Sequence, residues 1–291
     1  MDGERSSRDG RAGALCLASE AGGATVTTKG QKRMESKGDT EATQTTAPVR
    51  SIERALEIVR ILRENRAPMR LTDIARESGN HLATAQRMVN VLVRHGYVVQ
   101  ERNNYSIGIT SLLNAHAFLV SNSLIQVAHP VVQELASFSG LASSFAVRVG
   151  LKQIQLLRVY GVVPLPYQLP IGEPMPLHLG GARILAAALS PEDLQLLLDE
   201  TPEIRLANGT VVTQDEFIKS LQVIREQGYV CGYSQRELGA GSAAVPVYGP
   251  DETVVAALQL SWIVDEVDDA KMEWCVTELK RASAAITRRI P

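Results

Sequence analysis

Residues 71–107, with the sequence LTDIARESGNHLATAQRMVNVLVRHGYVVQERNNYSI, decide the fold of the N-terminal third of the protein. Apolar residues at helical spacing predict one short helix over 71–78 and another over about 82–95. Gly79 and Asn80 between them are typical of a tight turn, because glycine adopts positive φ without steric cost. Gly96 ends the second helix, and two short strands around a polar turn then predict a hairpin.

The residues just before this stretch predict a further helix. Apolar residues recur at helical spacing over 52–62, Ser51 is expected to cap the helix, and Pro68 stops it. Thr72 or its neighbour is expected to cap the next helix. Three short helices closed by a hairpin are typical of a winged helix-turn-helix, which we expect over residues 49–110. Such a module binds DNA or, in the alternative, mediates protein–protein contact.

The charged residues are distributed unevenly along the chain. Residues 49–110 hold ten arginines and six acidic residues, a net charge of +4. Residues 111–291 hold 13 basic and 19 acidic residues, a net charge of −6. A small basic domain joined to a larger acidic one indicates that the first domain meets a polyanion. Uneven solvated surface charge is the alternative explanation.

Length and composition exclude several classes of protein. The chain has 291 residues, enough for two domains, and 45% of them are hydrophobic. Its apolar runs are far shorter than the ~20 residues that cross a bilayer, and no signal peptide opens it, so we expect neither membrane spans nor secretion. Three distant cysteines form no disulfide or zinc pattern, which favours the cytoplasm. Residues 1–48, poor in periodic apolar residues, are expected to be a disordered extension.

The rest of the sequence predicts a linker and a second domain. Residues 111–126 are expected to form a linker helix for dimerisation, because they carry more apolar surface than one small domain covers, and Pro130 is expected to begin a fresh helix. Residues 127–291 mix strands and helices without a β-α-β rhythm, which predicts an α+β domain with an antiparallel sheet. The expected strands lie at 143–149, 153–160, 229–233, 243–247 and 254–262, and the expected helices lie at 182–189, from 191, at 214–227 and at 268–289, with Ser190 and Thr213 as caps.

Motifs in both domains occur in the order and spacing of a known family. They are Ser51-x-x-Arg54-Ala55-Leu56-x-Ile58, Leu71-x-x-Ile74-Ala75, Thr84-x-x-Arg87, Gly96-Tyr97-Val98, Ile171-Gly172-x-x-x-Pro176-Leu177-His178, Leu221-x-x-Ile224-Arg225-x-x-Gly228-Tyr229, Gly239 and Pro246-Val247. With these motifs, residues 51–291 resemble the IclR family of bacterial transcriptional regulators. The resemblance implies a dimeric or tetrameric regulator whose winged helix reads DNA and whose GAF-like C-terminal domain binds a small molecule.

The sequence also departs from the family pattern. Asn80 and Leu82 change the N-terminal end of the DNA-reading helix. The segment after His178 is rearranged, and Gly232 and Gln235 replace acidic residues that are common in the family. Because the later departures lie in or near the expected ligand pocket, the resemblance does not identify the effector.

DNA contact requires exposed side chains at the N-terminal end of the helix that enters the major groove. Glutamine and asparagine pair with adenine, and arginine pairs with guanine. Arg87 matches a recurrent family position, which favours a contact to the phosphate backbone over a base contact. Arg102 at the wing tip is expected to contact a phosphate or the minor groove. The candidate DNA-binding residues are His81, Thr84, Gln86, Arg87, Asn90 and Arg102.

The expected effector pocket combines a glycine turn with one face of a strand. Residues 180–182 precede a helix, so their free N–H groups are expected to hold a carboxylate. Strand alternation places Gln259 and Ser261 on one face of the strand expected over 254–262. Ser242 is added because it resembles a pocket position of the family. The alternative to a pocket is that the glycines serve tight packing and that the polar face of the strand is exposed to solvent. The candidate effector-binding residues are Gly180, Gly181, Ala182, Ser242, Gln259 and Ser261.

These residues favour a binding protein over an enzyme. His178 is expected to be a packed or capping histidine and Cys231 a small buried hydrophobe, since no nucleophile–base spacing or phosphate loop accompanies them. With no Arg or Lys assigned to the pocket, we expect an aromatic or short-chain carboxylate and no multiply charged ligand. The expected partners are double-stranded operator DNA, this organic acid and further copies of the chain, with no cofactor, metal or membrane. An enzyme or sensor whose winged helix mediates protein contacts is the rival hypothesis.

Overall fold

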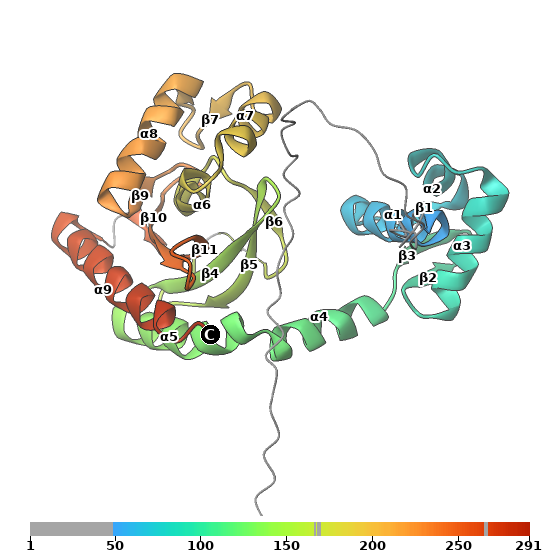
Figure 1. The fold of residues 1–291 in the computed structure, drawn as a ribbon, viewed down its shortest axis with the longest axis horizontal. Helices are drawn as coiled ribbons and strands as arrows, with labels where there is room; N and C mark the ends of the chain where they lie inside the picture. The colour runs from blue at the N-terminus through green and yellow to red at the C-terminus, as the bar shows by residue number, and fades with distance from the viewer. Residues whose placement is uncertain (1–48, 166, 168–169, 265–266) are drawn as a thin grey trace, which may run out of the picture. The chain divides into compact units, whose positions relative to one another are not determined.

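The computed structural model describes residues 49–165, 167, 170–264 and 267–291 (Figure 1). The extension over residues 1–48, predicted to be disordered, lies outside the described residues. Among the helices of the described part, none is long and apolar enough to cross a membrane.

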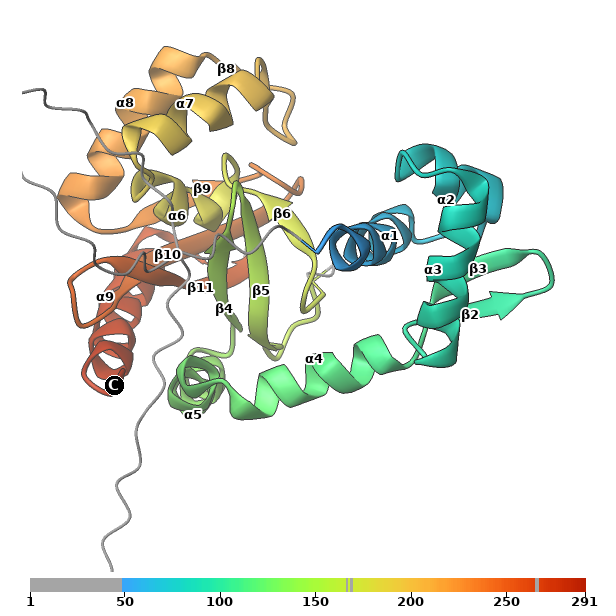
Figure 2. The same cartoon turned by 45° about the vertical axis from the view of Figure 1, so that its right-hand side comes forward.

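The first domain is a winged helix-turn-helix (Figure 2). Strand β3 pairs with β1 on one side and β2 on the other, and both pairs are antiparallel. The strand β1, which the sequence did not predict, therefore adds a third strand to the expected hairpin. The elements in chain order are α1 (Arg50–Asn65), β1 (Met69–Arg70), α2 (Leu71–Glu77), α3 (Leu82–Arg94), β2 (Val98–Glu101) and β3 (Asn104–Ile107).

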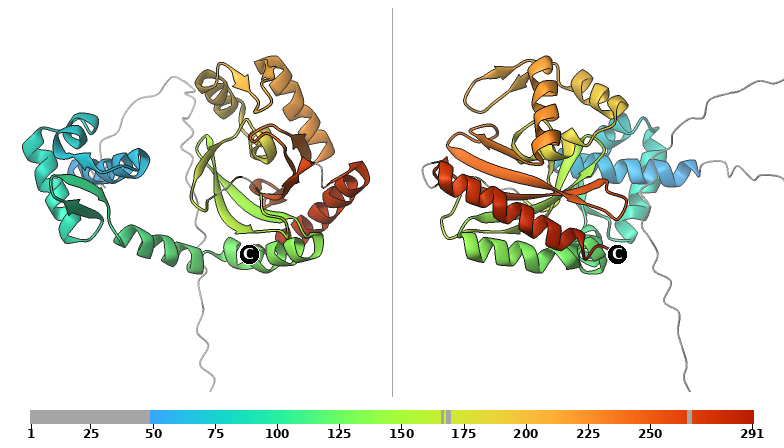
Figure 3. Two further views of the ribbon diagram at one scale, coloured as in Figure 1. Left: turned by 180° about the vertical axis from the view of Figure 1, so that it is seen from behind. Right: turned by 60° about the vertical axis from the view of Figure 1, so that its left-hand side comes forward.

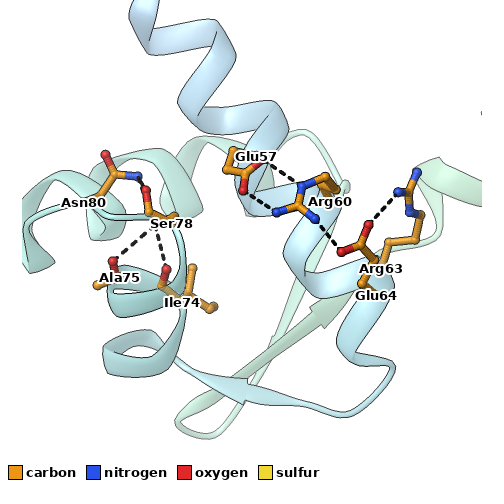
Figure 4. Close-up of polar contacts among 8 residues, drawn as sticks. All are labelled: Glu57, Arg60, Arg63, Glu64, Ile74, Ala75, Ser78 and Asn80. Atoms are coloured by element: carbon orange, nitrogen blue, oxygen red, sulfur yellow. Dashed lines mark hydrogen bonds and ion pairs between the residues drawn. The ribbon is translucent and has the colours of Figure 1, made fainter. Parts of the chain in front are cut away.

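The turn between α2 and α3 is held by side-chain hydrogen bonds (Figure 4). The Ser78 hydroxyl donates to the carbonyl of Ile74 over 2.6 Å, and the Asn80 amide donates to Ser78 Oγ over 2.9 Å. Gly79 between them has φ of +63°, a conformation that favours glycine. The turn thereby fixes the start of α3, whose buried Ala85 and Val89 face the domain core.

Two of the expected caps are absent. Helix α1 begins after Val49, so Ser51 lies inside the helix, and α2 begins after Arg70. Neither Val49 nor Arg70 forms a side-chain capping bond. The prediction of Ser51 and Thr72 as caps is therefore wrong, because the helices start earlier than their polar residues suggested.

The expected linker forms the helix α4 (Thr110–Ser121), which is followed by α5 (Ser123–Ser139). No residue of α4 is buried, and Leu112 and Phe118 keep 64% and 44% of their surface exposed. The Asn122 side chain accepts a hydrogen bond from the Ile125 N–H and so starts α5. Pro130 lies inside α5, so the prediction that it begins a helix is wrong. Proline has no N–H to bond the carbonyl four residues before it. Because Pro130 is exposed, water can bond that carbonyl instead.

The second domain is built on a six-stranded sheet with the order β6-β5-β4-β11-β10-β9, in which every neighbouring pair is antiparallel (Figure 1). This confirms the α+β class. The expected strands are present with slightly different ends. They are β4 (Ala142–Val149), β5 (Lys152–Val159), β9 (Val230–Tyr233), β10 (Ala240–Tyr248) and β11 (Val254–Ile263). The sequence did not predict the edge strand β6 (Pro174–Pro176) or the separate small pair β7 (Ile204–Arg205) and β8 (Val211–Val212).

Helices cover the two faces of this sheet in two layers (Figure 3). One face packs against α5 and the C-terminal helix around Phe145, Leu258 and Trp262. The other face packs against the segment that links β6 to β9, around Leu185 and Leu221. The helices of these layers are the 3-10 helix η1 (Gly180–Ala182), α6 (Arg183–Ala187), α7 (Pro191–Glu200), α8 (Gln214–Gln227) and α9 (Asp269–Thr287).

The caps predicted for the second domain are present. Ser190 accepts a hydrogen bond from the Asp193 N–H, with Pro191 in the first turn of α7. Thr213 and Glu216 form a reciprocal capping box at the start of α8. These caps fix the N-terminal ends of α7 and α8.

Candidate functional site

Five of the six residues predicted to contact DNA lie on the first three turns of α3 or just before it, and the sixth, Arg102, lies in the hairpin. His81 precedes the helix and is exposed, as are Arg87 and Asn90, whereas Thr84 and Gln86 are half-buried. The Gln86 amide donates to Asn90 Oδ1 over 2.8 Å, so these two side chains hold one another along the helix surface. The first turn contains no acidic residue, which leaves the positive end of the helix uncompensated.

The arginines of this domain fall into two groups. Arg60 on α1 binds both Glu57 and Glu64, and its charge is neutralised within the helix (Figure 4). Arg87 on α3 and Arg102 at the tip of the β2–β3 hairpin form no ion pair with any described residue. Arg102 is exposed and adopts φ of +56°, which bends the hairpin at its tip. Two unpaired cations therefore stand at the surfaces that a winged helix presents to DNA.

A small cavity lies between η1, the sheet and the loop between β9 and β10. Its volume is about 30 Å³, which is room for about one water molecule. Four of the six predicted effector residues line it: Gly180, Gly181, Ser242 and Gln259. The remaining lining residues are Tyr167, Gly232, Gln235, Arg236, Glu237, Ala240 and Gly241.

The other two predicted residues, Ser261 and Ala182, do not line the cavity. Ser261 accepts a hydrogen bond from the Gln259 amide over 2.9 Å and pairs across the sheet with Ser242. Ser242 lies inside β10, whereas the sequence placed it just before the strand. Gln259 and Ser261 keep only 6% and 1% of their surface exposed, which excludes the alternative of an exposed polar face. Ala182 is buried in the apolar core and does not line the cavity.

The glycines of η1 behave differently from the prediction. The Gly180 N–H is not free, because it donates to the side-chain oxygen of Gln235 over 3.0 Å. The expected helix over 182–189 is divided into η1 and the short α6. Gly181 is required by packing, since a Cβ there would lie 2.3 Å from Gln259 Oε1 and 3.0 Å from the Ala244 Cβ. Helix η1 therefore packs directly against the side chain of Gln259 on β11.

Arg236 is the residue of the cavity that the sequence did not reveal. Its Nη2 donates to the Leu179 carbonyl over 3.2 Å, its Nη1 lies 3.4 Å from Met175 Sδ, and its Nε is buried without a hydrogen-bond partner. Burial lowers the pKa of Arg236, partly offset by Tyr167 and Glu237. The expectation of a pocket without Arg or Lys is therefore wrong. No sequence pattern marks Arg236, because its place depends on the conformation of an irregular loop.

The two residues considered for catalysis are poorly suited to it. Burial lowers the pKa of His178, and the charges of Lys152 and Arg236 lower it further, so the imidazole is neutral at pH 7. Burial raises the pKa of the Cys231 thiol to about 11, which keeps it protonated and weakly nucleophilic. Within the described residues, no group of three or more His, Cys, Asp or Glu side chains is arranged to hold a metal ion.

Two family models match the chain. The IclR helix-turn-helix domain matches residues 51–102, and the C-terminal domain of the bacterial transcriptional regulator IclR matches residues 116–288. The chain is 27% identical over 245 residues to the HTH-type transcriptional regulator XynR of Escherichia coli K12, covering 83% of this chain and 97% of that protein. It is 24% identical over 237 residues to the transcriptional repressor IclR of the same organism, covering 78% and 85%.

Solved structures share the fold. An IclR transcriptional regulator from Alicyclobacillus acidocaldarius has a TM-score of 0.70 at 19% identity, covering 84% of this chain and 100% of that one. An IclR homolog from Microbacterium hydrocarbonoxydans, solved in complex with 4-hydroxybenzoate, has a TM-score of 0.68 at 22% identity, covering 82% and 98%.

The contact between Gly181 and Gln259 generates a test of the site geometry. Gly181→Ala is expected to lower the free energy of unfolding by about 1–3 kcal/mol, because the added methyl group overpacks a filled space. In a Gln259→Ala background the same change is expected to cost less, since the carboxamide is then gone. Chemical denaturation of the four proteins of this cycle measures the coupling, and additive effects would contradict the contact.

Proposed function

The chain belongs to the IclR family of bacterial transcriptional regulators, and on that premise we propose that it is a ligand-responsive repressor of a catabolic operon. The match of both family models, one to each domain, carries the proposal. Relatives of the chain are named as operon repressors, among them the acetate operon repressor of Salmonella typhimurium. A regulator of this kind needs a DNA-reading surface, a second copy and a ligand pocket that is coupled to them.

Helix α3 is assigned to the major groove of operator DNA. His81, Thr84, Gln86 and Asn90 are placed to meet base edges or the adjoining backbone, and Arg87 and Arg102 are placed to meet phosphates. The absence of ion pairs to Arg87 and Arg102 within the described residues supports this assignment. A side chain that is already neutralised, such as Arg60, contributes less to binding a polyanion.

Binding to a DNA fragment that contains the operator is expected to weaken steeply as salt rises, because phosphate contacts release counterions. Arg87→Ala is expected to reduce the slope of log K against log salt by about one unit. Arg60→Ala is the matched control, since its guanidinium is paired within α1. Fluorescence anisotropy over a salt series measures both slopes, and equal slopes for the two variants would remove Arg87 from the interface.

Helix α4 is assigned to assembly of a homodimer or a homotetramer. Its exposed Leu112, Leu113 and Phe118 lack a covering element within the described chain. Apolar side chains in such number on one short helix favour an interface. Two winged helices on one duplex also require at least two copies.

Light scattering at micromolar concentration is expected to give the mass of at least a dimer. Leu112→Asp is expected to shift the protein toward monomer, because the interface would have to bury a carboxylate without a partner. Asn114→Asp, an exposed polar position of α4, is the control. A monomeric parent protein would contradict the assignment.

The cavity at η1 is assigned to a small organic acid. Neutral hydrogen-bonding groups line it at Ser242, Gln259 and, through Gln259, at Ser261. The protonated thiol of Cys231 and the neutral His178 support binding without chemical conversion of the ligand. The 4-hydroxybenzoate bound to the Microbacterium relative is an acid of this chemical class.

Members of a panel of aromatic and short-chain carboxylates are expected to raise Tm and to weaken operator binding. An effector regulates only if it favours one of two states, so the two responses must appear together. Ser261→Ala and Gly181→Val are expected to blunt both responses. Thermal unfolding and anisotropy on the same samples check this. Binding restricted to neutral or cationic compounds would refute the acid assignment and leave the regulator assignment intact.

A further inference from the structure

Three arginines lie near the cavity: two contact η1 or the residue before it, and the third lies on the cavity face of the sheet. Arg158 comes from β5, Arg183 is the first residue of α6, and Arg236 lies in the loop between β9 and β10. None of the three forms an ion pair with a described residue. The acidic residue of the cavity lining, Glu237, is exposed at the rim.

The hydrogen bonds of these arginines are few and are made to neutral groups. Arg183 donates to the carbonyls of Gly180 and Cys231 over 3.4 and 3.5 Å, at the long end of hydrogen bonding. All three nitrogens of Arg158 are buried and lack a hydrogen-bond partner. Arg236 Nε is in the same condition. A buried guanidinium that lacks an anion is costly, so the fold holds a deficit of negative charge here.

The sheet register directs Arg158 toward the same face as the cavity. Arg158 pairs with Ser144 on β4, and Ser144 pairs with Gln259 on β11. Residues directly opposite in an antiparallel sheet share a face, so Arg158, Ser144 and Gln259 form one row. The guanidinium of Arg158 also lies 5.9 Å from the ring centre of Tyr167, which lines the cavity.

Gln235 lines the cavity next to Arg236 and joins the β9–β10 loop to η1. Its side-chain oxygen accepts the Gly180 N–H, and its amide lies so close to Gly232 that a Cβ there would be 2.3 Å from Nε2. An anionic oxygen in place of the carboxamide oxygen would accept the Gly180 N–H in the same cavity that Arg236 lines. Since the cavity is only about 30 Å³, a ligand larger than water requires lining side chains to move, and Gln235 is one of them.

We propose that the effector is a small dianion, a dicarboxylate or a phosphate monoester, whose charges are met by Arg236 and Arg158 after it displaces the Gln235 carboxamide. This inference rests on the proposed function and narrows its ligand class. Two anionic groups match Arg236 and Arg158 better than one, because a monoanion leaves one of these two guanidiniums without an anion. Burial lowers the pKa of Arg236, Tyr167 and Glu237 raise it, and the charge of Arg158 lowers it by a smaller amount, which places Arg158 within electrostatic reach of Arg236.

The first experiment needs no knowledge of the ligand. Gln235→Glu in the full-length protein places a carboxylate of the same shape beside Gly180 and the arginines. We expect it to raise Tm by about 3 °C without ligand, because it supplies the missing charge. Gln133→Glu on the exposed face of α5 is the control for an added charge and is expected to leave Tm unchanged. A Gln235→Glu protein with an unchanged or lower Tm would overturn the proposal.

The second experiment compares ligands of matched skeleton by calorimetry: succinate with butyrate, terephthalate with benzoate, and phenyl phosphate with phenol. We expect at least one dianion to bind about tenfold more tightly than its partner, since charge-assisted bonds are the strong ones. Preference for succinate or terephthalate identifies a dicarboxylate, and preference for phenyl phosphate identifies a phosphate monoester. Equal affinity within every pair, or no binding by any dianion, counts against the proposal.

Two arginine variants separate recognition from folding. Arg236→Gln and Arg158→Gln are expected to abolish the preference for the dianion while leaving Tm without ligand equal to or above that of the parent. Arg205→Gln, an exposed arginine of the same domain, is the control. A lowered Tm without ligand, together with an unchanged preference for the dianion, would assign the arginines to structure alone. Salt-dependent DNA binding, measured in parallel, reports on the proposed function independently of these outcomes.

Discussion

The register between β10 and β11 is the constraint on which the ligand-binding domain depends. It places Ser242 opposite Ser261 and Ala244 opposite Gln259, so the polar groups meet beneath η1 while Val245 and Leu258 meet in the opposite core. A slip by one residue would exchange the two faces, burying serines among the side chains of α5 and α9. The apolar core on one face therefore enforces the polar arrangement on the other. The close approach of Gly181 to Gln259 is a consequence of this register, because only a residue without a Cβ fits above the carboxamide.

The two domains handle positive charge in different ways. On α1, Arg60 is neutralised by neighbouring glutamates, and the unpaired Arg87 and Arg102 face solvent, where hydration makes the charge inexpensive. Around η1 the charges of Arg158 and Arg236 are shielded from water, so the same lack of partners has a large energetic cost. The exposed Arg87 and Arg102 are accessible to the DNA phosphates that we propose they bind. In the effector site that we propose, an anion bound in the cavity would supply charge to these guanidiniums around η1, so ligand binding would also stabilise this part of the fold.

Local patterns in the sequence were sufficient to predict the winged helix-turn-helix, because a glycine turn and two helical repeats lie within forty residues of one another. Strand alternation was likewise sufficient to place Gln259 and Ser261 on one face. The comparison with the family pattern had placed Gln235 in or near the pocket, and it lines the cavity. The sequence did not reveal Arg158 or Arg236, since sheet register and loop conformation bring them together from distant parts of the chain. It also misplaced the start of α5: a proline is a visible signal, whereas the Asn122 cap that starts the helix resembles many other asparagines. The DNA-contacting and ligand-contacting residues remain predictions whose geometry the structure describes.

The bare surface of α4 has a consequence for the lifetime of the protein. A helix of 12 residues with no buried side chain is near the length at which isolated helices are marginal in water. In the homo-oligomer that we propose, a second copy covers this helix. Without that copy, the segment between the two domains is an easily opened backbone that proteases can cleave. Newly made chains would then survive in proportion to their chance of meeting one another. Such a regulator sets a lower threshold on its own abundance, below which turnover outpaces pairing.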